Sequence, residues 1–418
     1  MMNKWSSLEA TPAVPLVAGG FSPLDELLQL SPGMLAPDIH EHLVRLSSRL
    51  PFEQAVEELY FSHHCHVSEP TARRLTQAAG EAWVELETEE ARRIQRELSS
   101  SPEGPLLQQF SVDGAMVPLV GGEWSEVKTL VIGALTGQEL GEAVKAQDLS
   151  YFSRLTDSES FTDLALVEVH RRGVDTAGVV VAINDGAAWE QGFVDAHRVD
   201  AVRVLDFGHA AEYLTRAAQA VYGAASQKCT NWLTRWQHEL RHGDSQLVLD
   251  ELIRLQDLAS LEAADIVSTS VKYLSERREQ IRYSEMELMG IPIGSGIVES
   301  GNKLVVEQRL KGSGMHWARR NVNPMLALRN VLCSQRWEGV WSFIIKRLRQ
   351  QQAEATSARR ARREAVEQPI QAVSEIVLNP AKAEPPAKPQ TTGRTKPAAN
   401  HPWRRYRNSC SLLPAAIS

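Results

Sequence analysis

Apolar residues recur at helical spacing through most of the first hundred positions. From about Pro37, the segments HEHLVRLSSRL and FEQAVEELYFSHH, separated by Pro51, and then VSEPTARRLTQAAGEAWVEL each repeat apolar residues every three to four positions. Glu81–Leu98 continues this pattern as a charged helix. The segment SSSPEGP at Ser99–Pro105 is typical of a linker, so we expect a domain boundary there.

The start of the third helix carries a candidate DNA-binding feature. We expect Ser68 to be its N-cap, with a Glu-Pro pair in the first turn and with Arg73 and Arg74 exposed just beyond. Two short helices joined by a tight turn fit a helix-turn-helix, and a plain helical hairpin is the alternative.

The pattern after the linker is that of strands. LLQQFSVDGAMVPLV predicts a strand, a turn and a continuing strand, and WSEVKTLVIGAL predicts its partner. The apolar segments GVVVAIND and Asp200–Asp206 predict buried strands, and Phe161–Arg172 and Ala187–His197 predict helices. A hairpin followed by β-α-β alternation indicates a mixed α/β fold with helices on the faces of the sheet.

The rest of the chain is predominantly helical. Tyr213–Met289 predicts an all-helical insertion, and the last helices are expected from about Pro324 to Arg349. Beyond Gln350 the chain becomes Pro- and Ala-rich and basic, which predicts disorder. We therefore expect an N-terminal helical region over 1–105, the sheet core over 106–211, the insertion over 212–289, C-terminal core helices over 290–349 and a disordered basic tail over 350–418.

The composition indicates in which cellular compartment the protein works. Apolar residues make up 43% and charged residues 23% of the chain, as in ordinary soluble proteins. There is no run of about 18 apolar residues, so no membrane span is expected, and the N-terminus lacks the apolar core of a secretory signal. The 4 cysteines form no CxxC pair, which favours a reducing cytoplasm and argues against structural zinc.

The net charge is −7, but the charged residues are distributed unevenly along the chain. From Lys346 to the end there are 14 Lys and Arg residues against 5 Asp and Glu, and Ile291–Arg336 holds 7 against 2. Such basic segments are what an anionic polymer would meet, although a solubilising tail is an equally simple interpretation.

Three acids stand out by position. Asp113 lies inside the first strand and Asp185 at the end of an apolar strand, each followed by Gly. Glu299 lies in GIPIGSGIVESGNKLVVEQRLKGSGMHW, where the GSG segment predicts a tight entry into a helix. Acids in buried strands are costly unless cations pair with them, and a pair of divalent cations would explain all three.

Each acid also has an ordinary structural explanation. Asp113 fits an Asp-Gly hairpin turn, Asp185 fits an N-cap of the following helix, and Glu299 with Lys303 fits a surface pair one helical turn apart.

Two histidine-containing groups add detail. Asp206 and His209 span one turn where a strand runs into a helix, so they could orient each other or support the acids through hydrogen bonds. The group His63, His64, Cys65 and His66 lacks a second ligand pair at zinc-finger spacing, so we interpret these histidines as structural or capping.

These motifs together resemble the DDE transposases of bacterial insertion sequences. VDGAMVPL with WSEVK, INDGAAW, LDFGHAAEYL and above all the Glu299 segment are similar to the Kra-type group, which is related to the Mutator-like superfamily. The resemblance covers roughly Gln109 to Trp341 and extends to HPWR near the end. It implies a ribonuclease H-like core with a helical insertion before the last acid, and it implies catalytic acids at Asp113, Asp185 and Glu299.

The resemblance also implies a function. Asp206-x-x-His209 matches the Asp-x-x-His signature of the superfamily. We expect a transposase that binds the terminal inverted repeats of its own element, cuts there and joins the ends to target DNA. Asp113 and Asp185 would bind two Mg²⁺ ions, replaceable by Mn²⁺, and Glu299 would complete one coordination sphere.

The expected partners follow from the reaction. Double-stranded DNA would be bound in the cytoplasm, at the nucleoid, by at least a homodimer, with no membrane involved. Basic side chains after the last acid would contact phosphates near the cut: Lys303, Arg309, Lys311 and Arg319. The N-terminal helices, with Arg73 and Arg74, would recognise the ends. The alternatives are a ribonuclease H-like nuclease that cuts without joining and a catalytically silent DNA-binding protein.

Overall fold

The computed structural model describes residues 35–136 and 145–375, with side chains described up to residue 362. The chain divides into two compact units, Met1–Ala355 and Thr356–Ser418. The first unit contains one five-stranded mixed sheet and most of the helices, so the mixed α/β class expected from the sequence is confirmed. None of the described helices is both long and apolar enough to span a bilayer.

Among the residues from 35 onward, the helices before the sheet are α2 (Pro37–Arg49), α3 (Phe52–His63) and α4 (Glu69–Glu97). Pro51 separates the first two, and Ser68 is at the N-cap position of α4, as expected. The two helical segments predicted on either side of Glu81 form one helix of 29 residues. His64 is the C-cap of α3 in the left-handed conformation, which agrees with the interpretation of that histidine as a capping residue.

The sheet has the strand order β3-β2-β1-β4-β5. The first three strands pair antiparallel, and β4 and β5 run parallel to β1. The strands are β1 (Leu107–Pro118), β2 (Trp124–Leu135), β3 (Ala146–Arg154), β4 (Val179–Asn184) and β5 (Val202–Leu205). Strand β3 was not predicted from the sequence.

Strand β1 runs without interruption through Asp113, so the predicted turn there is wrong. The hairpin instead turns at the Gly121–Gly122 pair, where both residues have positive φ. Glycine adopts that backbone conformation without steric cost, whereas Asp113 and Gly114 can remain extended.

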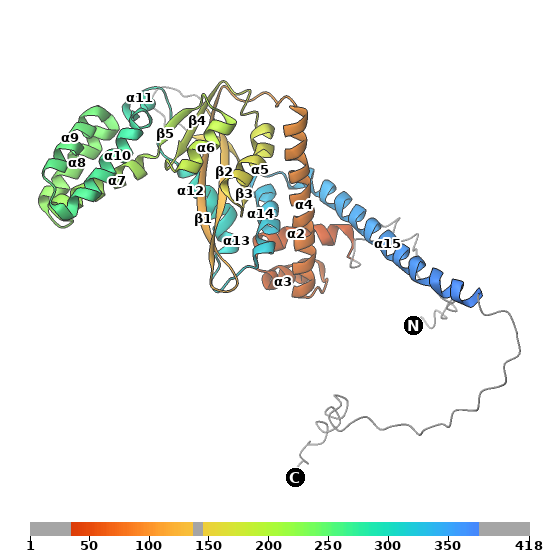
Figure 1. The fold of residues 1–418 in the computed structure, drawn as a ribbon. Coiled ribbons are helices and arrows are strands. Elements are labelled where there is room, and N and C mark those ends of the chain that lie inside the picture. The colour runs from red at the N-terminus through yellow and green to blue at the C-terminus, as the bar shows by residue number, and fades with distance from the viewer. Residues whose placement is uncertain (1–34, 137–144, 376–418) are drawn as a thin grey trace, which may run out of the picture. The chain divides into compact units, whose positions relative to one another are not determined.

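Alternation along β1 sends its side chains to two different cores. Phe110 and Val112 pack with Phe161 and Phe193 of α5 (Ser158–Arg171) and α6 (Ala188–His197), which cover one face of the sheet. Figure 1 shows these helices beside the strands. Asp113 is one position out of phase with Val112, so it belongs to the opposite face, where Ala115 and Val117 pack against the C-terminal helices.

The stretch expected to be a helical insertion is entirely helical (Figure 1). It comprises α7 (Phe207–Tyr222), α8 (Gln227–His242), α9 (Ser245–Asp257), α10 (Leu261–Glu276), a short 3₁₀ turn and α11 (Tyr283–Leu288). Side chains at the N-caps accept backbone N–H groups at the starts of α7 to α10, which explains where these helices begin.

The segment carrying Glu299 returns to the sheet. It consists of α12 (Gly296–Gly301), a π-helical turn (Asn302–Glu307), α13 (Gln308–Leu310) and α14 (Arg319–Cys333). As predicted, the Gly-Ser-Gly segment is the entry into a helix, and Glu299 is in its first turn. Helix α14 shares a core with α4, including Ala79, Trp83 and Leu328, so the N-terminal helices belong to the same compact unit as the sheet.

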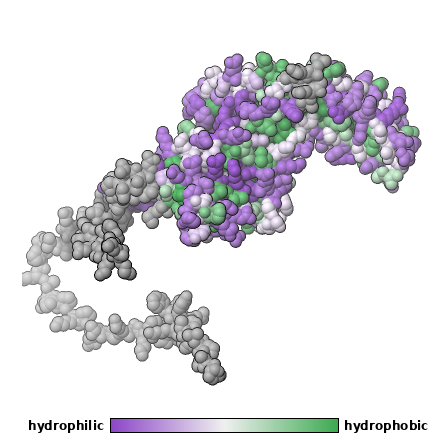
Figure 2. Space-filling view, turned by 180° about the vertical axis from the view of Figure 1, so that it is seen from behind, coloured by the Kyte–Doolittle hydropathy of each residue, from purple (hydrophilic) through white to green (hydrophobic). Residues whose placement is uncertain are grey.

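The last described helix, α15, runs from Trp337 to Glu375. The disorder expected from residue 350 is therefore wrong as far as Glu375, because Gln, Ala, Glu and Arg are all strong helix formers. The remainder of the predicted tail, 376–418, lies outside the described residues. In the space-filling view, hydrophilic residues cover much of the visible surface and interrupt its apolar patches (Figure 2).

Candidate active site

The register of the parallel strands brings three aspartates to one level. Phe110 of β1 pairs with Ala182 of β4, so Asp113 and Asp185 are each three residues further along neighbouring strands. Asn184 of β4 pairs with Leu205 of β5, which puts Asp185 level with Asp206. The carboxyl ends of parallel strands meet at one edge of a sheet, so two acids far apart in sequence lie side by side there.

Asp113 is held by two hydrogen bonds. Its Oδ1 accepts the N–H of Gly114 at 2.6 Å, and its Oδ2 accepts Nδ2 of the buried Asn302 at 2.8 Å. Burial raises the pKa of Asp113, and the negative charge of Glu299 raises it further, while the two hydrogen bonds lower it. The electrostatic effect of Glu299 on this pKa indicates that α12 brings its carboxylate near β1.

Asp185 occupies a turn at the end of β4. Burial raises the pKa of Asp185 to about 6, and the charges of Asp113, Asp206 and Glu299 act in the same direction. His209 opposes this shift, with its Nδ1 4.0 Å from Oδ2 of Asp185. The charges of three neighbouring acids therefore disfavour the ionised form of Asp185.

The alternative explanation of Asp185, as the N-cap of the following helix, is wrong. Helix α6 begins at Ala188, and Ala187 is the residue at its N-cap. The N–H of Ala187 donates to Oε2 of Glu190 at 2.9 Å, so Glu190 takes the capping role that Asp185 was expected to have. The side chain of Asp185 is left half-exposed beside the other acids.

Glu299 and Lys303 are both exposed, and in the described part of the chain no ion pair joins them. The π-helical turn that begins at Asn302 separates them and changes the spacing of the side chains. Single π-helical turns are rare and are frequent at functional sites. Here the turn points Asn302 toward Asp113 and leaves the Glu299 carboxylate facing solvent.

Asp206 joins two parts of the site. Its Oδ1 accepts the backbone N–H of His209 at 2.8 Å, and its Oδ2 accepts the backbone N–H of Ser295 at 2.7 Å. Asp206 therefore caps α7 and fixes the N-terminus of the helix that carries Glu299. It meets the main chain of His209, and the His209 ring approaches Asp185, so the ring does not orient Asp206.

Three further residues of the site were not identified from the sequence. Glu190 is 2% exposed, and burial raises its pKa to about 8, helped by the charges of Asp185 and Asp113. Asn302 and Glu190 could have been found, because they follow Glu299 and Asp185 by one helical turn or slightly more. Tyr273, whose hydroxyl donates to the backbone carbonyl of Asp185, is 88 residues away and has no such signal.

Arg309 was predicted to contact DNA, and the structure contradicts this. It is 2% exposed, its Nε donates to the carbonyl of Ser47 at 2.9 Å, and its guanidinium lies 4.9 Å from the Phe52 ring and 5.1 Å from the Trp317 ring. Burial lowers its pKa to about 10. Since α13 turns this side chain into the junction with α2 and α3, no phosphate can reach it.

The other predicted DNA-contacting residues are accessible to differing degrees. Arg319 is exposed and donates to Ser125 Oγ at 2.6 Å, whereas Lys311 is partly buried and pairs with Glu307 at 2.7 Å. Arg74 is exposed, and Arg73 is exposed but pairs with the residue one helical turn earlier.

The donor set suits a hard divalent cation. Carboxylate oxygens are the ligands that Mg²⁺ prefers. Burial is the main cause of the raised pKa values of Asp113 and Asp185, and a bound divalent cation would favour their charged forms. Across 35–136 and 145–362, no three His, Cys, Asp or Glu side chains already surround one point. Binding a cation at the acids therefore requires rotation of side chains, for which the exposed Glu299 is free.

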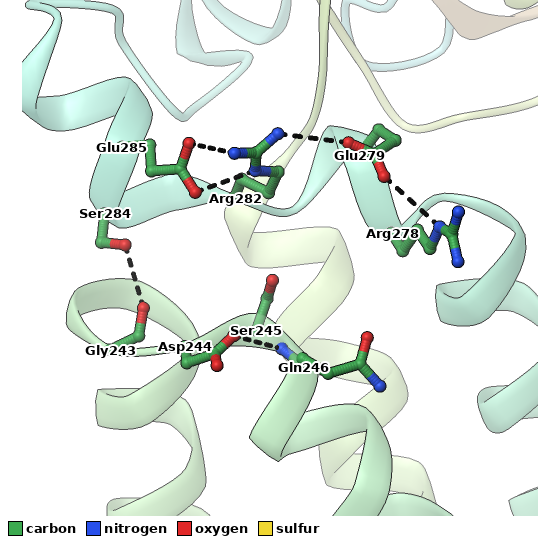
Figure 3. A pocket seen from close by; sticks show the side chains of 9 residues that line it. All are labelled: Gly243, Asp244, Ser245, Gln246, Arg278, Glu279, Arg282, Ser284 and Glu285. Carbon is green, nitrogen blue, oxygen red and sulfur yellow. Dashed lines mark hydrogen bonds and ion pairs between the residues drawn. The ribbon is translucent and has the colours of Figure 1, made fainter.

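A hollow lies in the helical insertion, and Asp113, Asp185 and Glu299 are not among the residues that line it (Figure 3). It has a volume of about 350 Å³. Arg282 pairs with both Glu279 and Glu285, and Asp244 caps α9 through the N–H of Gln246 at 2.8 Å. Its charged side chains therefore neutralise one another, which is typical of a structural surface network.

Comparison of the chain with protein-family models gave no match, and comparison with curated proteins gave none either.

Proposed function

We propose that this protein is a DDE-type DNA transposase with a ribonuclease H-like catalytic core. The observation that carries the proposal is the placement of Asp113, Asp185 and Glu299. Asp113 and Asp185 lie level on the parallel strands β1 and β4, and Glu299 lies in α12, directly before Asn302, whose side chain donates to Asp113. The strand order β3-β2-β1-β4-β5 and the helical segment between β5 and the Glu299 helix support it, because the sequence resemblance implies both.

In this proposal the three acids hold two Mg²⁺ or Mn²⁺ ions. The bound ions would supply activation of the attacking water or 3′-hydroxyl and stabilisation of the leaving 3′-oxygen. Asn302 holds Asp113 in place through Oδ2, and Asp206 fixes the start of α12, so that Glu299 can complete the ligand set. The imidazole of His209 lies beside Asp185, with its Nδ1 4.0 Å from Oδ2, and it opposes the upward shift of the pKa of Asp185.

The proposal assigns DNA binding to exposed cations. Lys303 and Arg319 would contact phosphates near the cut, and the partly buried Lys311 could do so only by exchanging its pairing with Glu307. Arg309 has no part in this because it is buried. The start of α4, with Arg73 and Arg74, would recognise the terminal inverted repeats together with α3 as a helix-turn-helix. Because the reaction pairs two ends, the active complex would be at least a homodimer, working on chromosomal DNA in the cytoplasm.

The test is cleavage and joining on a plasmid that carries the coding region with its natural flanks, in Mn²⁺. We expect the wild type to cut at the flanks and to produce strand-transfer products. Asp113→Ala, Asp185→Ala and Glu299→Gln should each lose cleavage by at least about 1,000-fold, because neutralising one ligand weakens both the binding of the ions and their alignment. End binding, measured by gel shift, should persist in Glu299→Gln.

Glu212→Gln is a matched control, because Glu212 is an exposed acid of α7 that pairs only with Arg216 at 3.0 Å. It should cut like the wild type. Cleavage without joining would indicate a nuclease, and end binding without cleavage by the wild type would indicate a silent DNA-binding protein. Activity that survives in one acid variant would remove that residue from the catalytic set.

A further inference from the structure

Side chains from the helical insertion hold the turn that carries Asp185. The hydroxyl of Tyr273 donates to the carbonyl of Asp185, and Nη2 of Arg277 donates to the carbonyl of Gly186 at 2.8 Å. Both side chains come from the C-terminal end of α10. The turn lies beyond the last ladder position of β4, so strand pairing does not fix these two carbonyls, and α10 supplies their hydrogen-bond donors instead.

The turn and α10 fit closely. Gly186 has φ of +81°, and a Cβ added to it would come within 2.7 Å of both the Tyr273 hydroxyl and Nε of Arg277. Only glycine accommodates both this backbone conformation and this approach. On the other side, Glu190 accepts the N–H of Ala187, so donors and acceptors from two elements fix three consecutive residues.

The two side chains from α10 are themselves rigidly held. The Arg277 guanidinium lies 3.8 Å from the centroid of the Tyr273 ring, and its Nη1 donates to the Tyr273 carbonyl at 3.0 Å. The opposite face of Tyr273 stacks on Tyr213 of α7, with centroids 4.0 Å apart and planes 8° apart. His209, which approaches the Asp185 carboxylate, packs edge-on against both tyrosine rings. One stack therefore contacts the backbone of Asp185 and the imidazole beside its side chain.

We propose that Tyr273 and Arg277 are positioning residues, which set the direction of the Asp185 carboxylate and thereby the affinity of the acids for divalent cations. This inference rests on the proposed function, since it assumes that Asp185 is a metal ligand. The insertion would then be part of the catalytic core and more than a passive helical addition. A residue that aims a metal ligand without touching the metal commonly changes metal affinity 10- to 100-fold when it is removed.

The test measures Mn²⁺ binding to the purified full-length protein without DNA, by electron paramagnetic resonance of the free ion. We expect the dissociation constant to rise about 10-fold in Tyr273→Phe and at least as much in Arg277→Met. Tyr273→Phe keeps the ring and its stacking and loses only the hydroxyl. Circular dichroism and thermal unfolding of the same samples establish that each variant is folded.

Tyr283→Phe is the matched control. Tyr283 is buried, whereas Tyr273 is partly buried, and the Tyr283 hydroxyl also donates to a backbone carbonyl, that of Leu205 at 2.9 Å. This carbonyl belongs to strand β5. Tyr283→Phe should lose a similar amount of stability and bind Mn²⁺ like the wild type. If it weakens Mn²⁺ binding as much as Tyr273→Phe, the effect is a general loosening of the insertion and the inference is overturned.

Failure of the inference and failure of the proposed function give different results. If the wild type cuts and joins DNA while Tyr273→Phe and Arg277→Met bind Mn²⁺ as tightly as the wild type, only the positioning role is wrong. The opposite case is that the wild type binds Mn²⁺ and the two variants bind it about 10-fold more weakly, but no DNA is cut. The positioning role is then supported, and the proposed transposase function is wrong. Absence of Mn²⁺ binding by the wild type overturns both.

Discussion

Buried ionisable groups in this protein occur in at least two different arrangements. Asp113 and Asp185 at the sheet edge have raised pKa values because burial, and to a lesser extent neighbouring negative charges, disfavour their charged forms. Arg309 and Arg329 are buried cations whose guanidinium groups donate to backbone carbonyls at the end of α2 and, for Arg329, in the π-helical turn. The first arrangement leaves negative charge for a cation, and the second joins elements that are distant in sequence. Sequence position alone does not distinguish them, which is why Arg309 was assigned to DNA.

His40 gives a residue-scale prediction about stability and pH. It is 1% exposed, neither ring nitrogen has a hydrogen-bond partner among the described residues, and burial lowers its pKa to about 4. Between pH 6.5 and 4 the unfolded state takes up a proton that the folded state excludes, so stability is full above pH 6.5 and is lost as the pH falls. The loss should reach about 3 kcal/mol.

The measurement is urea unfolding at pH 7 and pH 4. His40→Leu should lose about 3 kcal/mol less than the wild type over this interval, because the variant has no buried imidazole to protonate on unfolding. His238→Leu, which replaces an exposed histidine, should keep the wild-type dependence. Equal pH dependence in all three proteins would show that His40 is not the responsible group.

At the scale of elements, the sequence predicted strands and helices wherever an apolar pattern was regular. It therefore located Asp113 in a strand, Asp185 at a strand end and Glu299 in a helix entry, and the parallel register of β1 and β4 explains why the two aspartates lie level. It missed β3, and it could not predict the π-helical turn at Asn302 or the hydrogen bond of Tyr273 to Asp185. These depend on packing between segments far apart in the chain, which local periodicity does not report.

The crossing of α4 and α14 gives an element-scale prediction. A Cβ on Gly80 would lie 2.2 Å from the carbonyl oxygen of Pro324, so the two helix backbones meet at this glycine. Gly80→Ala should destabilise the protein by about 1–3 kcal/mol through overpacking. The higher helix propensity of alanine would by itself stabilise the protein by about 1 kcal/mol, so a net loss of stability would report the overpacking.

Gly192→Ala is the matched control, because Gly192 is a helical glycine whose added Cβ would have no neighbour within 4 Å. It should raise the stability by about 0.5–1 kcal/mol. The thermal unfolding temperature should thus fall in Gly80→Ala and rise in Gly192→Ala. A stabilised Gly80→Ala variant would contradict the close crossing.

At the scale of the whole molecule, two boundaries were expected from the sequence, one at the linker 99–105 and one near residue 350. The linker at 99–105 lacks regular structure throughout. Helices α2 to α4 nevertheless share cores with the sheet and α14, because the apolar faces of α2 and α4 need a partner that the local sequence does not contain. The change of composition near residue 350 does lie close to a division, since the second compact unit begins at Thr356. The change of composition therefore lies close to the start of the second unit, although it wrongly predicted disorder for the residues up to Glu375, which are helical.

Truncation after Ala355 tests this division. It removes 11 Lys and Arg residues against 4 Asp and Glu and changes the net charge from −7 to −14. The unfolding transition of the first unit should be unchanged, because its cores are built from residues before the cut. Affinity for double-stranded DNA should fall, and the dependence of log K on log salt should become less steep, by about 0.9 for each phosphate that the shortened protein no longer neutralises. If the truncated protein binds DNA with the wild-type salt dependence, the basic segment beyond Ala355 binds no phosphate and serves solubility alone.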